Sequence, residues 1–136
     1  ALSGGLLAIM LLFASYQNYD LVFRQYKNLY TQSAWNTSEM GQVVRAFGQL
    51  TGTTDTAWLV GYPYWVDSRL VGINAGLPTR DTAIWAEDLE VTISDPRPKL
   101  FLVNPADQPA IDKLTRLYPT GSLTTYDSQV DKDFLM

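Results

Sequence analysis

The pattern of apolar and polar positions first marks an unusual N-terminal segment. Ala1 to Tyr19 contains no charged residue, and the apolar residues between Leu6 and Ala14 are placed all around a helix. From Tyr16 to Tyr30, apolar residues recur at steps of three and four, which is typical of an amphipathic helix. We therefore predict one or two helices, apolar and rich in tyrosine, in residues 1–34.

The apolar segment allows two interpretations. A helix that is apolar all round lies either in a protein core or in a membrane. A complete span needs roughly 20 apolar residues, and Leu6–Ala14 alone is shorter, so the segment fits the end of a transmembrane helix rather than a whole one. Tyr16 and Tyr19 suit the aromatic belt at a membrane interface. A core helix and the end of a membrane helix both stay open.

Beyond the N-terminal segment, short apolar runs alternate with helical patterns. The runs that predict strands are bounded by Gly, Pro or Asp; they cover residues 56–60, 82–85, 99–103, 122–126 and, as an edge strand, 133–136. Trp58 and Trp85 fall within two of these runs, and we expect both in the core. This alternation predicts a three-layer, Rossmann-like α/β domain over residues 35–136, with a mostly parallel sheet of about four to five strands.

Two helices carry more specific expectations. Asn36 and Glu39 form a capping-box pattern at the start of a helix. The helix that follows the first strand is expected to bury Leu70, Val71 and Ile73.

The stretch between the first strand and its helix holds the candidate ligand-binding residues. Ligands in open α/β sheets bind beyond the carboxyl ends of the strands. The candidates there are Tyr62, Tyr64, Trp65, Asp67 and Arg69. The aromatic rings could stack on a sugar, while Asp67 and Arg69 hydrogen-bond its hydroxyl groups. In the structural alternative, Tyr62 and Trp65 seal the end of the sheet, Asp67 caps the helix and Arg69 pairs with a carboxylate.

Composition excludes several kinds of function. The net charge is −4 and no cluster of Lys and Arg occurs, which argues against nucleic-acid binding. The chain has no Cys and no His, so Ser-His-Asp or Cys-His catalysis and the usual zinc sites are excluded. No glycine-rich loop that would hold a phosphate follows a strand. We predict no catalytic residue, no metal site and no cofactor for this chain.

The order of segments resembles a known family. The segments that carry the likeness are Asn18–Tyr26, Gly61–Asp67, Lys99–Asp107 and Leu117–Gly121, preceded by the apolar helix. They resemble the C-terminal soluble domain of bacterial polytopic glycosyltransferases of the dolichyl-phosphate-mannose–protein mannosyltransferase type. The likeness covers nearly the whole chain, but it includes no catalytic motif.

The resemblance implies a function for the parent protein. In that superfamily the membrane-embedded half uses a lipid-linked sugar donor and holds the catalytic carboxylate, so no catalytic residue is carried over. The chain would then be a non-catalytic domain on the extracytoplasmic side of the bacterial envelope, with the membrane and a carbohydrate or polypeptide acceptor as partners. The charged residues next to the apolar run weakly favour the opposite side of the membrane, because Arg24 and Lys27 are typical of a cytoplasmic flank. The alternative is an independent soluble α/β domain that binds a small ligand or a protein.

Overall fold

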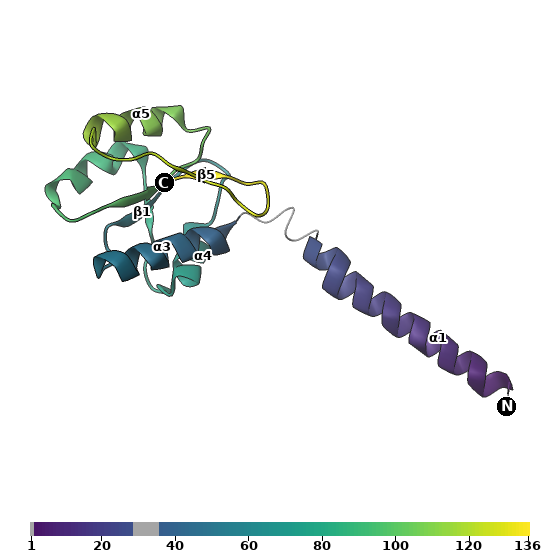
Figure 1. Cartoon of the computed structure of the whole chain (residues 1–136). Helices are drawn as coiled ribbons and strands as arrows, with labels where there is room; N and C mark the ends of the chain where they lie inside the picture. Colours follow the sequence, from purple (N-terminus) through teal and green to yellow (C-terminus); the bar gives the residue numbers. More distant parts are fainter. Residues whose placement is uncertain (1, 29–35) are drawn as a thin grey trace. The chain divides into compact units, whose positions relative to one another are not determined.

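A computed structural model of the chain describes residues 2–28 and 36–136. The chain divides into two compact units, Ala1–Trp35 and Asn36–Met136 (Figure 1). The predicted boundary between residues 34 and 35 lies outside the described residues, as does the predicted end of the amphipathic helix at Tyr30.

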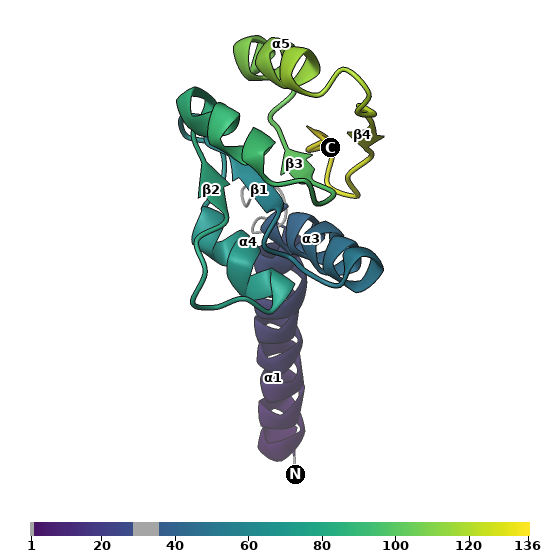
Figure 2. The ribbon, with the colours of Figure 1, turned by 90° about the vertical axis from the view of Figure 1, so that its left-hand side faces the viewer.

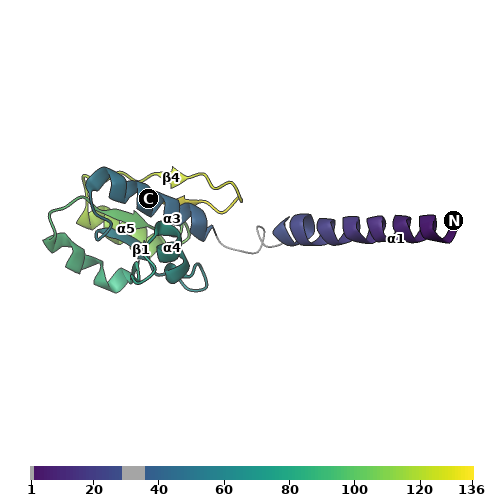
Figure 3. The ribbon, with the colours of Figure 1, turned by 90° about the horizontal axis from the view of Figure 1, so that it is seen from below.

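Within the first unit, residues 2–28 form one unbroken helix (Figure 3). It consists of α1 (Leu2–Tyr19), the π-helical segment η1 (Asp20–Gln25) and a last α-helical turn that reaches residue 28. The part from Gly4 to Asn28 has 25 residues, and its most apolar 18-residue window has a mean hydropathy of 1.4, so its length and composition suit a membrane span. Core helices and signal sequences meet the same test, but none of its most apolar window is buried.

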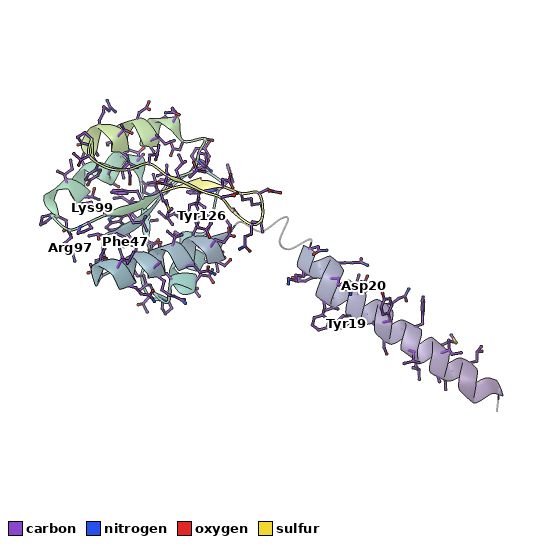
Figure 4. All side chains as sticks on the ribbon, in the orientation of Figure 1. Tyr19, Asp20, Phe47, Arg97, Lys99 and Tyr126 are labelled. Carbon is purple, nitrogen blue, oxygen red and sulfur yellow. The ribbon has the colours of Figure 1, made fainter. Side chains whose placement is uncertain are left out.

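The π-helical segment brings three polar side chains of this helix together. Gln25 Nε2 donates a hydrogen bond of 2.8 Å to Asp20 Oδ2, and Arg24 lies 3.7 Å from Asp20 Oδ1. The rings of Tyr19, at the end of α1, and Phe23, within η1, have centroids 4.9 Å apart (Figure 4 labels Tyr19 and Asp20). Wider π-helical spacing favours such an i, i+5 contact, and it gives the Asp20 carboxylate two partners within its own helix.

The second unit is a mixed α/β structure around a small parallel sheet. β1 (Ala57–Val60) lies in the centre, with β2 (Ala83–Ile84) and β3 (Leu100–Leu102) on either side in the order β2-β1-β3 (Figure 2). Leu59 is paired with Ala83 on one side and with Leu102 on the other. The predicted strands over 56–60, 82–85 and 99–103 therefore form, each one or more residues shorter than its pattern.

Helices cover both faces of this sheet. α3 (Thr37–Thr51) and α4 (Ser68–Ala75) pack on one face, while the 3₁₀ helix η2 (Ala86–Ser94) and α5 (Gln108–Leu117) pack on the other. The core cluster on the α3–α4 face contains Met40, Val44, Ala57, Leu59, Trp65, Val71, Ala75, Leu102 and Phe134. The cluster on the α5 face contains Val60, Ile84, Leu89, Val103, Ala110 and Ile111.

The C-terminal strands differ from the predicted parallel arrangement. β4 (Thr125–Tyr126) and β5 (Phe134–Leu135) form an antiparallel pair, and Leu135 also bridges Val103 just beyond β3. β5 was predicted as an edge strand, but it has partners on both sides and Phe134 is fully buried. The turn between the strands explains the reversal, because the Asp133 carboxylate accepts the Ser128 amide at 2.9 Å and folds the chain back.

The predicted capping box does not form. Asn36 is the N-cap of α3, but its side chain makes no capping hydrogen bond, and Nδ2 donates instead to the Lys132 carbonyl at 2.6 Å. The Glu39 carboxylate accepts from Ser128 Oγ at 2.6 Å and from the Gln129 amide at 3.1 Å. Both side chains hold the loop between β4 and β5 against α3, so tertiary contacts replace the local cap.

The buried side of α4 also differs from the prediction. Val71 is buried as expected, whereas Leu70 and Ile73 remain exposed. Gly72 and Ala75 are buried in their place. A Cβ at Gly72 would lie 2.8 Å from the Arg80 carbonyl oxygen, so the small residues set the packed side.

The contact between α3 and α4 gives a first testable prediction. A Cβ at Gly41 would lie 2.5 Å from Asn74 Cβ and 2.7 Å from the Asn74 carbonyl carbon, so Gly41→Ala must push the two helices apart. We expect the free energy of unfolding in urea to fall by about 1–3 kcal/mol from overpacking, partly offset by the roughly 1 kcal/mol that Ala gains over Gly in a helix. Ala46 also lies in α3 but is exposed, so Ala46→Gly serves as the control that measures the difference in helix propensity between Ala and Gly alone. If Gly41→Ala stabilised the protein by as much as Ala46→Gly destabilises it, the close packing would be contradicted.

Candidate functional site

The carboxyl ends of the three parallel strands meet at one edge of the sheet. There the chain leaves β1 at Gly61, β2 at Trp85 and β3 at Val103, and the loop after β1 leads into α4. This is the edge at which open α/β sheets bind ligands.

Two of the five predicted site residues belong to the core at this edge. Trp65 is only 4% exposed and is a member of the cluster on the α3–α4 face. Tyr62 is half-buried and packs against the same cluster, and its carbonyl accepts the Trp65 amide at 3.3 Å. These two rings seal the end of the sheet, as the structural alternative predicted.

Asp67 and Arg69 lie at the start of α4. The Asp67 carboxylate accepts the Arg69 amide at 2.9 Å and so acts as the N-cap of the helix. The Arg69 guanidinium is exposed, and among the described residues no carboxylate lies within 4 Å of it. Hydrogen bonds from the Ala83 amide and Ser68 Oγ lower the pKa of Asp81, and the positive charge of Arg69 lowers this pKa a little further.

Tyr64 is the one predicted site residue whose ring is completely free. It is fully exposed, and its backbone has a positive φ of 55°. A bulky residue rarely adopts this left-handed conformation, which costs on the order of 1 kcal/mol. The ring is therefore held away from the core at the tip of the loop.

Trp85 is a residue of this edge that the sequence prediction missed. It was expected in the core, but 58% of it is exposed. β2 ends at Ile84, so the Trp85 side chain leaves the sheet and lies against Gly61, where a Cβ would be only 2.6 Å from Trp85 Cε3. The alternation of buried Ile84 with its neighbour could have indicated that Trp85 points away from the core.

The chemistry of this edge is that of a binding surface. Tyr64 and Trp85 offer exposed aromatic faces, and the exposed Arg69 guanidinium at the start of α4 is a further hydrogen-bond donor. Within residues 2–28 and 36–136, no group of three or more Asp and Glu residues is placed to hold a metal ion. The arrangement suits stacking on a ring and hydrogen bonding to its rim.

A groove of about 700 Å³ lies elsewhere, beside β3 and α5. We call it the β3 groove; one wall is formed by β3 and α5, and the other by the segment 119–124. Phe101 and Tyr118 face each other there with ring centroids 5.5 Å apart, and Tyr118 Oη lies 2.6 Å from Thr92 Oγ1. No sequence pattern indicated this groove, because it forms only when β3, α5 and the segment 119–124, which follow one another in the chain, pack together.

Two cations line the entrance of the β3 groove, on the segment that leads into β3 (Figure 4 labels Arg97 and Lys99). Arg97 makes a bidentate contact with Asp95, the shorter bond being 2.6 Å, and lies 3.5 Å from Asp55. Lys99 Nζ donates to the backbone carbonyls of Asp95 and Arg97 and lies 5.5 Å from the centre of the Tyr118 ring.

The Asp95–Arg97 pair gives a prediction about pH. Hydrogen bonds from Arg97 lower the pKa of Asp95 to about 2. Because the pKa of Asp95 is lower in the folded than in the unfolded state, its ionised carboxylate stabilises the folded state at pH values above about 4. That contribution is lost as the pH falls from about 4 towards 2. Because the pair is exposed, the effect on stability is small, and the pKa itself is the quantity to measure by carboxyl NMR titration. We expect Arg97→Gln to return the pKa of Asp95 towards its ordinary value, whereas Arg116→Gln leaves it unchanged.

Comparisons with protein-family models, with curated proteins and with solved structures found no match to this chain. Any functional assignment of the sheet edge or of the β3 groove therefore rests on the geometry of the structure alone.

Proposed function

We propose that this chain is a membrane-anchored, non-catalytic domain of a bacterial glycosyltransferase that uses a lipid-linked sugar donor. The observation that carries the proposal is the 25-residue helical segment Gly4–Asn28, which contains an apolar 18-residue window and precedes a separate folded unit. At about 1.5 Å per residue, this apolar window is roughly 27 Å long, close to the hydrocarbon thickness of a bilayer. Tyr16, Tyr19 and Tyr26 follow its most apolar part, where a membrane interface accommodates aromatic rings.

The folded unit is, in this proposal, a reduced Rossmann-like domain on the extracytoplasmic side. The order β2-β1-β3 and the helices on both faces support this assignment. The antiparallel pair of β4 and β5 is a separate two-stranded sheet, which an isolated bridge between Val103 and Leu135 links to the end of β3.

The proposed role of this unit is to contact carbohydrate through Tyr64 and Trp85. Both rings are exposed at the carboxyl edge of the sheet, and neither is needed to fill the core. The faces of a sugar ring are apolar and its rim is polar, so exposed aromatic faces suit it, and the exposed Arg69 guanidinium could donate to its hydroxyl groups.

Binding of oligosaccharides tests this role. The whole chain in detergent micelles is titrated with mannan, galactan and chitin oligomers, and binding is followed by calorimetry. We expect at least one of them to bind, and Tyr64→Ala and Trp85→Ala each to weaken that binding about tenfold, equivalent to about 1.4 kcal/mol.

The controls separate binding from stability. Both variants should keep the unfolding midpoint of the original protein, because both side chains are exposed. Leu50→Ala, at an exposed position near the end of α3, should change neither property. Carbohydrate binding that survives both aromatic substitutions would contradict the assignment of this edge.

The gene itself tests the membrane part of the proposal. If the reading frame continues upstream of Ala1 with several apolar spans of about 20 residues, and with an Asp or Glu in the first outside loop, the glycosyltransferase assignment stands. A start codon or a cleavable signal directly upstream would instead support the alternative, an independent α/β domain that binds a small ligand or a protein.

A further inference from the structure

Helix α4 exposes two large apolar side chains that the core does not use. The sequence pattern predicted that Leu70 and Ile73 would be buried, but Leu70 is 45% and Ile73 53% exposed. The two residues are three positions apart, so their side chains are neighbours on the helix surface. We call this pair the α4 patch; α4 lies beside α3 in the folded unit (Figure 2). Single exposed apolar residues are ordinary, whereas a neighbouring pair is a candidate contact surface.

The charges around the α4 patch balance one another. Two arginines and two aspartates lie on α4, at its N-cap or in a hydrogen bond with α4: Arg45, Arg69, Asp67 and Asp81. The exposed apolar pair Val91 and Ile93 on η2 has different surroundings. η2 itself carries three carboxylates, and one lysine bonds to it: Glu87, Asp88, Glu90 and Lys113. Excess carboxylates resist transfer out of water, so of these two pairs only the α4 patch suits the apolar boundary of a bilayer.

The chain enters the folded unit beside the α4 patch. Asn74, which directly follows Ile73, donates from Nδ2 to Oγ1 of Thr37, the first residue of α3, at 3.4 Å. The connection from Asn28 to Asn36 reaches about 29 Å at full extension, roughly the diameter of a small domain. A bilayer that the N-terminal helix spans is therefore always within reach of the unit, at a high effective concentration.

We propose that the α4 patch docks on the surface of the bilayer that the N-terminal helix spans. Leu70 and Ile73 enter the boundary between headgroups and acyl chains, while the Arg69 guanidinium stays among the headgroups. The inference rests on the membrane anchor of the proposed function and goes beyond it, because it gives the folded unit a lipid contact of its own. α4 follows the loop that carries Tyr64, so docking holds the candidate carbohydrate edge near the membrane surface, where the sugar of a lipid-linked donor lies.

Fluorescence quenching by lipids tests the docking. The chain contains no Cys, so a single introduced Cys carries a nitrobenzoxadiazole label at one chosen position. Ile73→Cys and Ile93→Cys form a matched pair, because the two isoleucines are 53% and 51% exposed. The whole labelled chain is placed in phosphatidylcholine nanodiscs with and without lipids that carry doxyl quenchers along their acyl chains. We expect quenching of the label at position 73 to be at least about twice that at position 93.

A charge placed in the patch should release it from the lipid. Leu70→Glu, added to the chain labelled at position 73, should lower the quenching to the level found at position 93. Val91→Glu, added to the same chain, should leave the quenching unchanged. Both side chains are exposed, so both variants should keep the unfolding midpoint, and circular dichroism checks this.

A third label separates this inference from the membrane anchor. Leu11→Cys lies in α1, and its label is quenched only if the helix inserts. Quenching at position 11 with equal quenching at positions 73 and 93 would overturn the docking and leave the anchor in place, whereas an unquenched label at position 11 would overturn both. Quenching at position 73 that survives Leu70→Glu would also overturn the docking. So would shielding of that label from aqueous iodide without lipid quenching, which would assign the patch to a second copy of the chain.

Discussion

Phe134→Ala is expected to lower the free energy of unfolding by about 3–5 kcal/mol, the range for removing a fully buried aromatic ring. Phe134 is 0% exposed and belongs to the core cluster on the α3–α4 face. Its ring also stacks on Tyr126 with centroids 4.6 Å apart, so the side chain joins β5 both to the sheet and to β4. The cavity left by Ala would loosen the whole C-terminal strand pair.

Urea unfolding, followed by far-UV circular dichroism, measures this loss. Val91→Ala serves as the control, because that side chain is 67% exposed and its truncation should change the stability by less than about 0.5 kcal/mol. Phe134→Leu should cost less than Phe134→Ala, since it keeps most of the apolar volume. A loss below about 1 kcal/mol for Phe134→Ala would mean that β5 is not part of the cooperative core.

Local signals predicted those parts of the fold that depend on neighbours in the chain. β1 and β3 are short apolar runs between turn residues, and such runs form buried parallel strands. α4 begins at the Asp67 N-cap and ends at Gly76, which has the left-handed φ of 85° that favours glycine. Each of these features is determined by a few consecutive residues.

Contacts between distant segments explain the differences. Asn36 and Glu39 match a local cap, but the Lys132 carbonyl and Ser128, about ninety residues away, use both side chains. Likewise, an apolar pattern at residues 133–136 cannot show that the strand is antiparallel and has partners on both sides, because its register depends on Val103.

The candidate site likewise combines features that local sequence predicts with features that depend on tertiary contacts. Sequence position placed Tyr62, Trp65 and Tyr64 together after β1, yet only the tertiary structure separates the two core rings from the exposed one. Trp85 joins the edge because Gly61 leaves room for its ring. Spacing along the chain gave no sign of the β3 groove, because β3, α5 and residues 119–124 create it only when they pack.

Leu11→Arg is expected to abolish stable association of the chain with a neutral bilayer. Leu11 lies well inside the apolar part of α1 and is exposed. An Arg near the centre of a membrane helix costs about 2.5–3.5 kcal/mol, which lowers partitioning by about two orders of magnitude. Flotation with phosphatidylcholine vesicles after removal of detergent measures the bound fraction.

The control for this variant carries the same added charge outside the helix. Gln49→Arg, at an exposed position of α3, should float with the vesicles like the unchanged chain. If Leu11→Arg floated equally well, the apolar helix would not be the membrane-binding element. If the unchanged chain failed to float, the exposure of its apolar residues would need another explanation, and the independent α/β domain would become the better assignment. Neutral lipid makes the result specific, because attraction between an added Arg and anionic headgroups cannot compensate for the lost apolar contact.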